Sequence, residues 1–383
     1  MSGRKCRIWI VSELYKPSNT STAHILAQIT DFLSRDYEVL VIAGKSASFK
    51  YGLNENTVIF PNEYIKYINS PFERSKILRL FFGLFFSIKA TIYLLRNIEQ
   101  GDKILAVTNP QTLILILPYF FKKNLTFLIH DIFPENLIAT SLGFSQFLGR
   151  FLNPIFNASY KRLSHAIVLG DDMKQVIERK GVKNVSIIRN WADEELKINP
   201  FPIGKLRILY AGNVGNLQGL QVFLSWFKQL NENLFELHVR GEGEAKQELV
   251  LAVNAYNMNN VHFDGPYMRD EQSNILGMAH FGLVSLDAKM FGFGVPSKFY
   301  NIVKAGRPVL YFGPKFTEIY NCVNLNSLGL VIDIDEPIEV VSERMISLIQ
   351  QFSPEYYENI YIQKFSKRNV ESHFLNYFKD IDK

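Results

Sequence analysis

The chain has 383 residues, of which 47% are hydrophobic, and a formal net charge of +5 at pH 7. This length exceeds one ordinary hydrophobic core and predicts two globular domains of roughly 150 to 200 residues each. The two cysteines, Cys6 and Cys322, are far apart in the sequence, so neither a disulfide framework nor a cysteine zinc site is supported, which favours the cytoplasm.

The first half of the chain alternates between short apolar runs and helical stretches. The first apolar run ends at Ser12 and Glu13, which is too short for a signal peptide, so we expect no export signal. Strands buried on both faces, joined by crossover helices, predict a doubly wound parallel sheet. The expected strands are 6–12, 38–44, 103–109, 125–131 and 165–170, and the expected helices are 22–35, 110–123 and 171–181.

Residues 72–97 combine crowded phenylalanines with basic side chains. The apolar run between Arg79 and Lys89 is much shorter than the ~20 residues that span a bilayer. Two interpretations stay open: an amphipathic helix at an anionic membrane surface, or a buried domain helix whose basic ends snorkel to water. The basic residues are interleaved with aliphatic bulk and form no polar stripe, which does not favour nucleic acid.

A linker at 199–205, with two prolines and a glycine, precedes a second α/β series. Its expected strands are 206–212, 234–241, 260–265, 281–286, 307–313 and 328–334. The predicted organisation is an N-terminal Rossmann-like domain at 1–198 and a C-terminal one at 199–365. A helix at 366–383 is expected to pack back on the N-terminal domain.

Ligands of open parallel sheets bind beyond the carboxyl ends of the strands, so the loops that follow strands carry the functional predictions. Gly212, Gly215 and Gly219 lie between a strand and a helix. They would let the backbone approach a phosphate at the helix end, although such glycines also serve as plain turn or cap residues. The spacing matches neither G-x-G-x-x-G nor a Walker motif.

Two further loops of the second half offer positive charge. Arg240 ends a strand and could contact a diphosphate in bidentate fashion, or form a salt bridge with Glu242 or Glu244. In the stretch GVPSK, residues 294–298, Lys298 could neutralise a phosphate that already accepts amide hydrogen bonds near Gly294. An ordinary surface lysine is the alternative.

Polar loops also follow strands of the first half. His130 and Asp131, with Glu135 nearby, could act as acid, base or electrostatic stabiliser, or His130 and Asp131 could simply cap a helix. The loop after the first strand contains the hydroxyl residues Ser18, Thr20, Ser21 and Thr22. These could bind acceptor hydroxyls or provide an N-cap.

The order of the stretches SELYKPSNTST, HDIFPENL, LYAGNVGNLQGL and GVPSKFYNIVKAGRPVL resembles bacterial glycosyltransferases of the GT-B fold. The resemblance is closer to family 4 enzymes of O-antigen, capsule and colanic-acid-type polysaccharide biosynthesis, including acetylfucosamine transferases. It runs over about residues 7–365 and is strongest in the second domain. It implies two Rossmann-like domains with an interdomain cleft.

The resemblance also implies an activity: retaining, metal-independent transfer of a sugar from a nucleotide diphosphate, here UDP rather than GDP. His130 and Asp131 would lie at the reaction centre, with the acceptor on the first domain. No cofactor is implied, because the nucleotide sugar is a substrate. The implied donor-binding residues are Asn213, Gly215, Arg240, Gly265, Tyr267, Gly294, Val295, Pro296, Ser297, Lys298 and Asn301.

The chain departs from the family at defined positions. Phe293 and Asn301 stand where many members have two glutamates, and an asparagine can still bond a ribose hydroxyl. Gln218 and Gly219 replace the usual lysine-glycine pair. The implied acceptor is a glycan on a polyprenyl diphosphate carrier at the cytoplasmic membrane face. The alternatives are a non-catalytic partner of a polysaccharide assembly complex and a nucleotide-sugar epimerase.

Overall fold

The computed structural model describes residues 6–18, 20–45, 63–69, 76–140, 144–192 and 196–381. The chain divides into two compact units. Unit 1 comprises 1–169, 173–188 and 371–383, and unit 2 comprises 170–172 and 189–370. The predicted domain boundary at 198/199 lies a little further along the chain than this division.

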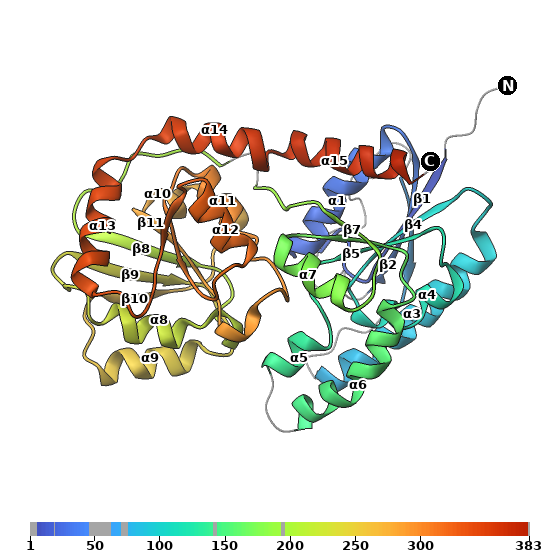
Figure 1. Ribbon diagram of the computed structural model, residues 1–383, viewed down its shortest axis with the longest axis horizontal. Helices are drawn as coiled ribbons and strands as arrows, with labels where there is room; N and C mark the ends of the chain where they lie inside the picture. The colour runs from blue at the N-terminus through green and yellow to red at the C-terminus, as the bar shows by residue number, and fades with distance from the viewer. Residues whose placement is uncertain are drawn as a thin grey trace. The chain divides into compact units, whose positions relative to one another are not determined.

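Among the described residues, unit 1 contains a parallel sheet of seven strands in the order β3-β2-β1-β4-β5-β6-β7 (Figure 1). The strands are β1 (Arg7–Ser12), β2 (Glu38–Gly44), β3 (Glu63–Ile68), β4 (Lys103–Val107), β5 (Leu125–Ile129), β6 (His165–Val168) and β7 (Asn184–Ile187). Its helical elements are α1 (Ser21–Ser34), α3 (Lys76–Asn97), η1 (Gln111–Leu115), α4 (Leu117–Phe120), α5 (Glu135–Thr140), α6 (Phe144–Tyr160), most of α7 (Asp171–Arg179) and most of α15 (Lys367–Asp380).

Unit 2 has a second parallel sheet, with six strands in the order β10-β9-β8-β11-β12-β13 within the described residues. The strands are β8 (Leu206–Ala211), β9 (Phe235–Arg240), β10 (Val261–Asp264), β11 (Phe281–Ser285), β12 (Val309–Phe312) and β13 (Gly329–Val331). The helical elements are η2 (Asn216–Gln218), α8 (Leu220–Phe227), α9 (Lys246–Ala255), η3 (Arg269–Glu271), α10 (Gln272–Gly277), η4 (Ala288–Met290), α11 (Lys298–Lys304), α12 (Glu318–Leu325), α13 (Ile338–Gln350) and α14 (Pro354–Phe365).

The sheets form because the central strands are apolar on both faces. In unit 1, β4 and β5 are buried throughout, and Trp9 of β1 pairs with Leu40 of β2 and Ile104 of β4. In unit 2, the residues of β9 are alternately buried and half-buried. Phe235, Leu237 and Val239 are buried among residues of α8 and α9. Every other residue of β9, beginning at Glu236, therefore points to the opposite face.

Two strands of unit 1 are missing from the sequence expectations, and one expected helix needs correction. The strands β3 and β7 were not predicted, because both lie at the edges of the sheet and neither is a purely apolar run. The helix expected at 110–123 is two short pieces, η1 and α4, which meet at Ile116, where the backbone leaves helical geometry. Pro118 has no amide hydrogen, so it fits only the first turn of a new helix.

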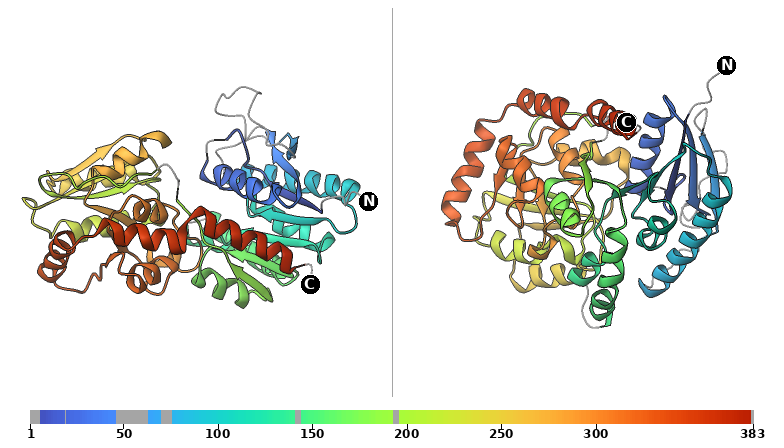
Figure 2. Two further views of the ribbon diagram at one scale, coloured as in Figure 1. Left: turned by 90° about the horizontal axis from the view of Figure 1, so that it is seen from above. Right: turned by 45° about the vertical axis from the view of Figure 1, so that its right-hand side comes forward.

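The final helix, α15, is built into unit 1 from Glu371 onward. Lys379 pairs with Asp36 at 2.9 Å, just after α1, and the rings of Phe378 and Tyr37 meet edge to face. Lys103 of β4 donates to the carbonyl of Phe378 at 2.6 Å. Figures 1 and 2 both draw α15 beside α1.

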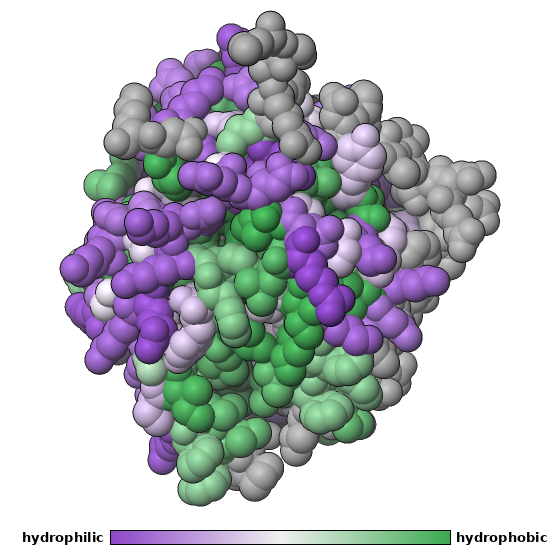
Figure 3. Space-filling model, turned by 90° about the vertical axis from the view of Figure 1, so that its right-hand side faces the viewer, coloured by the Kyte–Doolittle hydropathy of each residue, from purple (hydrophilic) through white to green (hydrophobic). Residues whose placement is uncertain are grey.

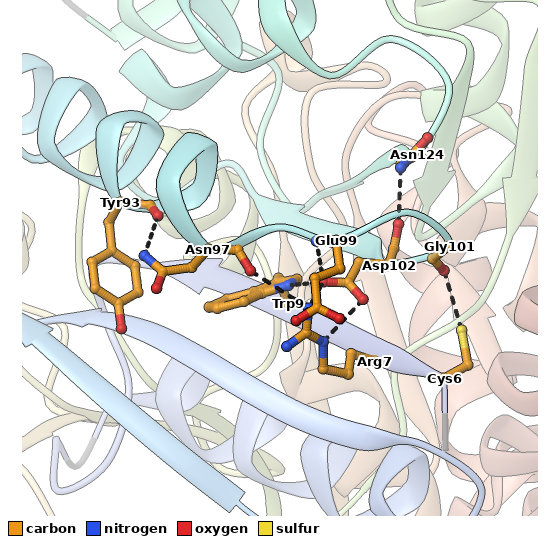
Figure 4. A network of polar contacts seen from close by, with 9 residues as sticks. All are labelled: Cys6, Arg7, Trp9, Tyr93, Asn97, Glu99, Gly101, Asp102 and Asn124. Carbon is orange, nitrogen blue, oxygen red and sulfur yellow. Dashed lines mark hydrogen bonds and ion pairs between the residues drawn. The ribbon is translucent and has the colours of Figure 1, made fainter. Parts of the chain in front are cut away.

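A network of hydrogen bonds and ion pairs connects the amino-terminal ends of β1 and β4 in the unit 1 sheet (Figure 4). Asp102 accepts hydrogen bonds from Arg7 Nε at 3.0 Å and Nη2 at 2.7 Å, and from Trp9 Nε1 at 2.8 Å. The amide of Glu99 donates to the same carboxylate at 3.0 Å, and Asn124 Nδ2 donates to the Asp102 carbonyl at 2.9 Å. Both carboxylate oxygens of Asp102 and its carbonyl oxygen therefore have hydrogen-bond partners.

Candidate functional site

The donor residues expected from the sequence lie at the end of β9, in the loops that follow β8, β10 and β11, and at the start of α11 in unit 2. Their strands are neighbours in the sheet, so these loops leave the same carboxyl-terminal edge. In open parallel sheets this edge is where ligands bind. The order of the strands thus brings together segments that are separated by many residues in the sequence.

The loops after β8 and β9 pack backbone against backbone. Gly212 donates to the carbonyl of Arg240 at 2.9 Å, and Val214 donates to that of Glu242 at 2.9 Å. A Cβ on Gly241 would lie 1.9 Å from the Gly212 oxygen, and the φ of Gly241 is +138°. Glycine is therefore required at position 241, because any side chain would push the two loops apart.

Lys298 reaches this pair of loops from the start of α11. Its Nζ lies 3.4 Å from the centroid of the Tyr210 ring, and a Cβ on Gly212 would be 3.2 Å from the same nitrogen. This nitrogen is buried and has no hydrogen-bond partner among the residues that the structure describes. Burial lowers the pKa of Lys298 well below its usual value. The sequence alternative of an ordinary surface lysine is wrong.

The remaining residues of the GVPSK stretch directly precede Lys298 in the chain. Gly294, Val295, Pro296 and Ser297 are half-buried, and α11 begins directly after them. Asn301, one turn into the helix, donates from Nδ2 to Gln272 Oε1 at 3.3 Å. Because α11 has only seven residues, the amine of Lys298 rather than the helix dipole is the group of this loop that could carry a full positive charge beside an anion.

Arg240 ends β9 and pairs with Asp264 at the end of β10, with Nε 3.4 Å from Oδ2. The sequence alternative, a salt bridge to Glu242 or Glu244, is wrong. Glu242 pairs with Lys246 at 2.7 Å, and Glu244 accepts a hydrogen bond from Asn216 at 3.0 Å. Glu242 thus has a partner on α9 and Glu244 has one in the loop after β8, while Arg240 pairs across the sheet with Asp264.

Asn213 and Gly215 lie in the loop after β8. The hydroxyl of Tyr210 donates to the Asn213 carbonyl at 2.5 Å, and the Gly215 amide donates to Gln218 Oε1 at 3.0 Å. Gln218, which replaces a lysine common in the resembled family, thus holds the loop itself.

Gly265 and Tyr267 follow β10. A Cβ on Gly265 would meet no atom within 4 Å, so space is open beside its backbone. Tyr267 packs at the margin of the unit 2 core.

In unit 1, His130 follows β5 and is anchored to the end of β4. Its amide donates to Thr108 Oγ1 at 3.1 Å. Its Nε2 is buried without a hydrogen-bond partner in the described part of the chain, and burial lowers the pKa of His130 to about 4. The ring is therefore neutral at pH 7. The alternative of a satisfied capping histidine does not describe this ring.

The acids near His130 have separate surroundings. Asp131 is exposed at its surface and accepts a hydrogen bond from Asn136 Nδ2 at 3.0 Å, yet the surrounding protein desolvates its carboxyl group and raises its pKa. Glu135 forms a short ion pair with the buried Lys180. Of these two acids, Asp131 is the one with an exposed side chain, while Glu135 has a structural partner.

The hydroxyl residues of the first loop lie where β1 leads into α1. Thr20 is the N-cap of α1 and accepts a hydrogen bond from the Ala23 amide at 3.3 Å. Ser18 donates to Thr20 Oγ1 at 3.3 Å, while Ser21 and Thr22 form the first turn of the helix. Capping thus occupies Thr20, and Ser21 has the most exposed side chain of the four.

Sequence reasoning missed Tyr210 and Thr108. Both contact a predicted site residue from a strand or a strand end. Tyr210 lies in an apolar run, where an aromatic ring is normally a core residue. Nothing in the sequence around either residue indicates these contacts.

Solved structures with the same fold define the class. The structure titled WaaG, "a glycosyltransferase involved in lipopolysaccharide biosynthesis", matches with a TM-score of 0.64 at 14% identity, over 96% of this chain and 98% of that chain. Anabaena Alr3699/HepE in complex with UDP and glucose matches with a TM-score of 0.64 at 15% identity, over 98% and 100%. The chain therefore has the predicted GT-B fold, with two Rossmann-like units.

The sequence comparison is consistent with that class. No protein-family model matches the chain. Over 357 residues it is 27% identical to "Probable glycosyltransferase WbjE" of Pseudomonas aeruginosa, which covers 87% of each chain. The fold and this relative together support a glycosyltransferase activity of the type found in polysaccharide or lipopolysaccharide biosynthesis.

Proposed function

We propose that this protein transfers a sugar, with retention of anomeric configuration, from a UDP-linked donor to a lipid-linked glycan in surface polysaccharide biosynthesis. The observation that carries the proposal is the buried, unpartnered amine of Lys298 beside the glycine loops. A buried amine without a counter-charge is costly. A phosphate placed there would supply that charge and raise the pKa of Lys298 again.

The proposed chemistry follows from where negative charge develops. When the bond between the anomeric carbon and the β-phosphate oxygen breaks, the leaving nucleotide gains charge on that phosphate. Lys298 and Arg240, with backbone donors near Gly294 and Gly215, would stabilise it more in the transition state than in the ground state. In this proposal these groups supply the positive charge, without a metal.

His130 and Asp131 are proposed to act at the reaction centre. The acceptor hydroxyl must lose its proton as its oxygen bonds to the anomeric carbon. A neutral imidazole with a free Nε2 can accept a hydrogen bond or a proton, and the pKa of about 4 keeps His130 in that form. Asp131 would stabilise the positive charge that develops on the sugar. Ser18, Ser21 and Thr22 are proposed to contact acceptor hydroxyls.

The remaining donor residues have proposed roles around the nucleotide. Asn213 and Gly215 would approach the phosphates, and the backbone from Gly265 to Tyr267 would border the base. Asn301 would bond a ribose hydroxyl in place of its present partner, Gln272. The UDP-bound structure of Alr3699/HepE supports uridine as the first nucleotide to test.

The acceptor proposal has structural support in an apolar surface of unit 1, which we call the α3/α6 face. It is formed by exposed residues of α3, α4 and α6, and η1 contacts both α3 and α6. Figure 3 shows hydrophobic side chains gathered over the lower part of the side that it draws. The exposed residues are Leu78, Phe81, Leu84, Phe85, Ile88, Ile92 and Leu95 on α3, Tyr119 and Phe120 on α4, and Phe147, Phe151 and Ile155 on α6.

The spacing of these residues matches one side of each helix. On α3 most of them recur every three or four positions, and on α6 they recur every four. Phe81, Phe147 and Phe151 are 64%, 66% and 65% exposed. A large apolar area of this kind marks an interaction surface. The exposed side of α3 favours the membrane-surface interpretation, while its other side packs in unit 1.

We propose the bilayer surface as the occupant because exposed cations accompany the apolar residues. Lys89, Arg96 and Arg150 are exposed on these helices, and Lys89 lies 4.1 Å above the Phe85 ring. By length and composition Leu78–Asn97 could cross a membrane, but 33% of its most apolar window is buried inside the protein. An interfacial position at the cytoplasmic face, next to the lipid-linked acceptor, accommodates both the buried and the exposed sides.

The function is tested by incubating the purified chain with a panel of UDP- and GDP-sugars, with and without a polyprenyl-diphosphate glycan. We expect release of UDP that requires the glycan. Conversion of the donor without any acceptor would indicate an epimerase. Binding of the glycan by a chain that consumes no nucleotide sugar would indicate a non-catalytic partner.

The membrane proposal is tested by co-sedimentation with vesicles that contain anionic lipid at low salt. We expect the wild type to sediment and the double variant Phe81→Glu/Phe151→Glu to remain in solution. The control is Leu325→Glu, which changes a residue of α12 in unit 2 that is 83% exposed. Equal sedimentation of the double variant and the control would contradict this part of the proposal.

A further inference from the structure

Two histidines and a glutamate meet on one face of the unit 2 sheet. Glu236 and His238 are two positions apart on β9, so their side chains point the same way. His262 lies on β10, the edge strand, and is directly paired with His238 in the ladder. The sheet register therefore places all three side chains in one cluster, on the face opposite the apolar residues of β9.

The nitrogen and oxygen atoms of this cluster converge. His238 Nε2 lies 3.5 Å from Glu236 Oε1, and His262 Nε2 lies 4.0 Å from Glu236 Oε2. One ligand atom from each residue can be chosen so that all three lie within 4.8 Å of one another. Among the described residues, the buried His238 Nε2 has no hydrogen-bond partner.

Outer contacts orient two of these side chains. Asp264 Oδ2 lies 3.6 Å from His238 Nδ1, on the opposite side of the ring from Nε2. Arg207 Nε donates to Glu236 Oε1 at 2.6 Å, which leaves Oε2 facing His262. A carboxylate at the far nitrogen of a histidine, and a held carboxylate ligand, are the supports that metal-binding residues commonly have.

We propose that Glu236, His238 and His262 bind a divalent transition-metal ion, with zinc as the reference ion. Two imidazoles and a carboxylate suit zinc and its neighbours rather than magnesium or calcium. Three protein ligands leave a position for water or a second molecule. Access is from solvent, because the His262 side chain is 45% exposed.

The electrostatics fit this assignment. Burial, together with Arg207 and His262, lowers the pKa of His238, and a metal binds the neutral form of a histidine. Arg207 next to Glu236 opposes a cation, so we expect weaker binding than at a structural zinc site with four ligands. The proposal adds a binding site and does not depend on the transfer reaction proposed above.

The test is titration of the full, tag-free chain with ZnCl2 and, separately, with MgCl2, followed by calorimetry. We expect one zinc ion per chain and no comparable binding of magnesium. His262→Gln and His238→Gln should each weaken zinc binding at least tenfold. Asp264→Asn should weaken it by about tenfold, through loss of the outer contact. Cobalt in place of zinc should give the visible absorption of a low-coordinate site.

The matched control is His373→Gln, which removes an exposed histidine of α15 and should leave zinc binding unchanged. His262 lies at an exposed edge, so His262→Gln remains informative even if His238→Gln fails to fold. The proposal is overturned if the wild type shows no saturable binding at millimolar zinc. It is also overturned if His262→Gln binds zinc as the wild type does.

Discussion

Asp102 and Lys298 are both charged residues with buried ionisable atoms, but their surroundings differ. The Asp102 side chain is 6% exposed and accepts hydrogen bonds from Arg7, Trp9 and the Glu99 amide (Figure 4). The amine of Lys298 has an aromatic ring beneath it and no hydrogen-bond partner in the described ranges. One region has its polar groups satisfied within the chain, and the other lacks a partner for a buried amine.

The pKa directions express the same difference. Burial alone would raise the pKa of Asp102, but the hydrogen bonds from Arg7, the Glu99 amide and Trp9 outweigh it and lower that pKa. The charged form of Asp102 is thus stabilised by the fold. Burial lowers the pKa of Lys298, and no charged partner among the residues that are described opposes that shift. Satisfied buried groups contribute to stability, whereas an unsatisfied one is a candidate for a binding site, which is the role proposed for Lys298.

The largest expected effect on stability comes from breaking the satisfied region. Asp102→Asn removes the charge that pairs with Arg7, whose side chain is only 11% exposed. We expect the free energy of unfolding to fall by about 3 kcal/mol, as for other broken buried pairs, measured by urea denaturation. Nucleotide affinity of the folded fraction should not change. An unchanged denaturation midpoint would contradict the structural role of this network.

At Lys298 we expect the opposite result, namely unchanged stability and a loss of activity. Lys298→Met keeps the length of the side chain and removes the amine, so unfolding free energy should be unchanged or higher. Turnover should fall by about 100- to 1,000-fold, or roughly 3 to 4 kcal/mol in barrier, and UDP binding should weaken. Calorimetry with UDP and initial-rate assays measure the two effects. Equal UDP affinity in the variant and the wild type would discard the phosphate role.

The buried ring of His130 should make the free energy of unfolding depend on pH. Its pKa is about 4 in the folded chain, against an ordinary value of 6.5. Below pH 6.5 the unfolded chain binds a proton here first, so stability that is complete above pH 6.5 is lost as the pH falls toward 4. The loss from this group between pH 7.5 and pH 5 is about 2 kcal/mol.

The measurement compares unfolding free energies at the two pH values for the wild type and His130→Gln. The variant should lose less stability than the wild type, whereas His373→Gln should behave as the wild type does. The same His130→Gln variant should keep its UDP affinity and transfer sugar more slowly in a single turnover. Identical pH dependence in all three proteins would show that His130 is not a buried neutral ring.

The smallest expected effect on stability comes from Asn124, at the periphery of the hydrogen-bond network around Asp102. Asn124→Ala removes one hydrogen bond, to the Asp102 carbonyl, and leaves the carboxylate contacts intact. We expect a loss of about 1 kcal/mol in unfolding free energy, with no effect on turnover. A loss as large as that of Asp102→Asn would mean that Asn124, and not the ion pair, holds this edge of the sheet together.

Much of the fold could be predicted from local pattern. The central strands of both sheets are apolar runs long enough for a strand, and the linked crossover helices specify parallel pairing. The edge strands β3 and β7 could not be recognised in this way, because an edge strand need not be apolar on both faces. The helix expected at 110–123 was wrong because Pro118 favours a restart, which the apolar pattern did not indicate.

The candidate site was less accessible to sequence reasoning. The loops around Gly212, Arg240 and Lys298 could be chosen because they follow strands, and their roles remain predictions. The partner of each side chain could not be predicted. Arg240, for example, pairs with Asp264 rather than with the acids next to it in sequence. Contacts within one loop are visible in the sequence, whereas contacts across neighbouring strands depend on register.

The sequence by itself determined the alternation of strands and helices, because each apolar run has to be buried and each glycine-rich break has to turn the chain. Only the tertiary structure decided which polar atoms have partners. The pairing of β9 with β10 brings His262 onto His238, and the packing of α11 places Lys298 over Tyr210 without a counter-charge. Burial and pairing depend on residues distant in the chain, and these properties separate the stabilising polar groups from the proposed binding sites.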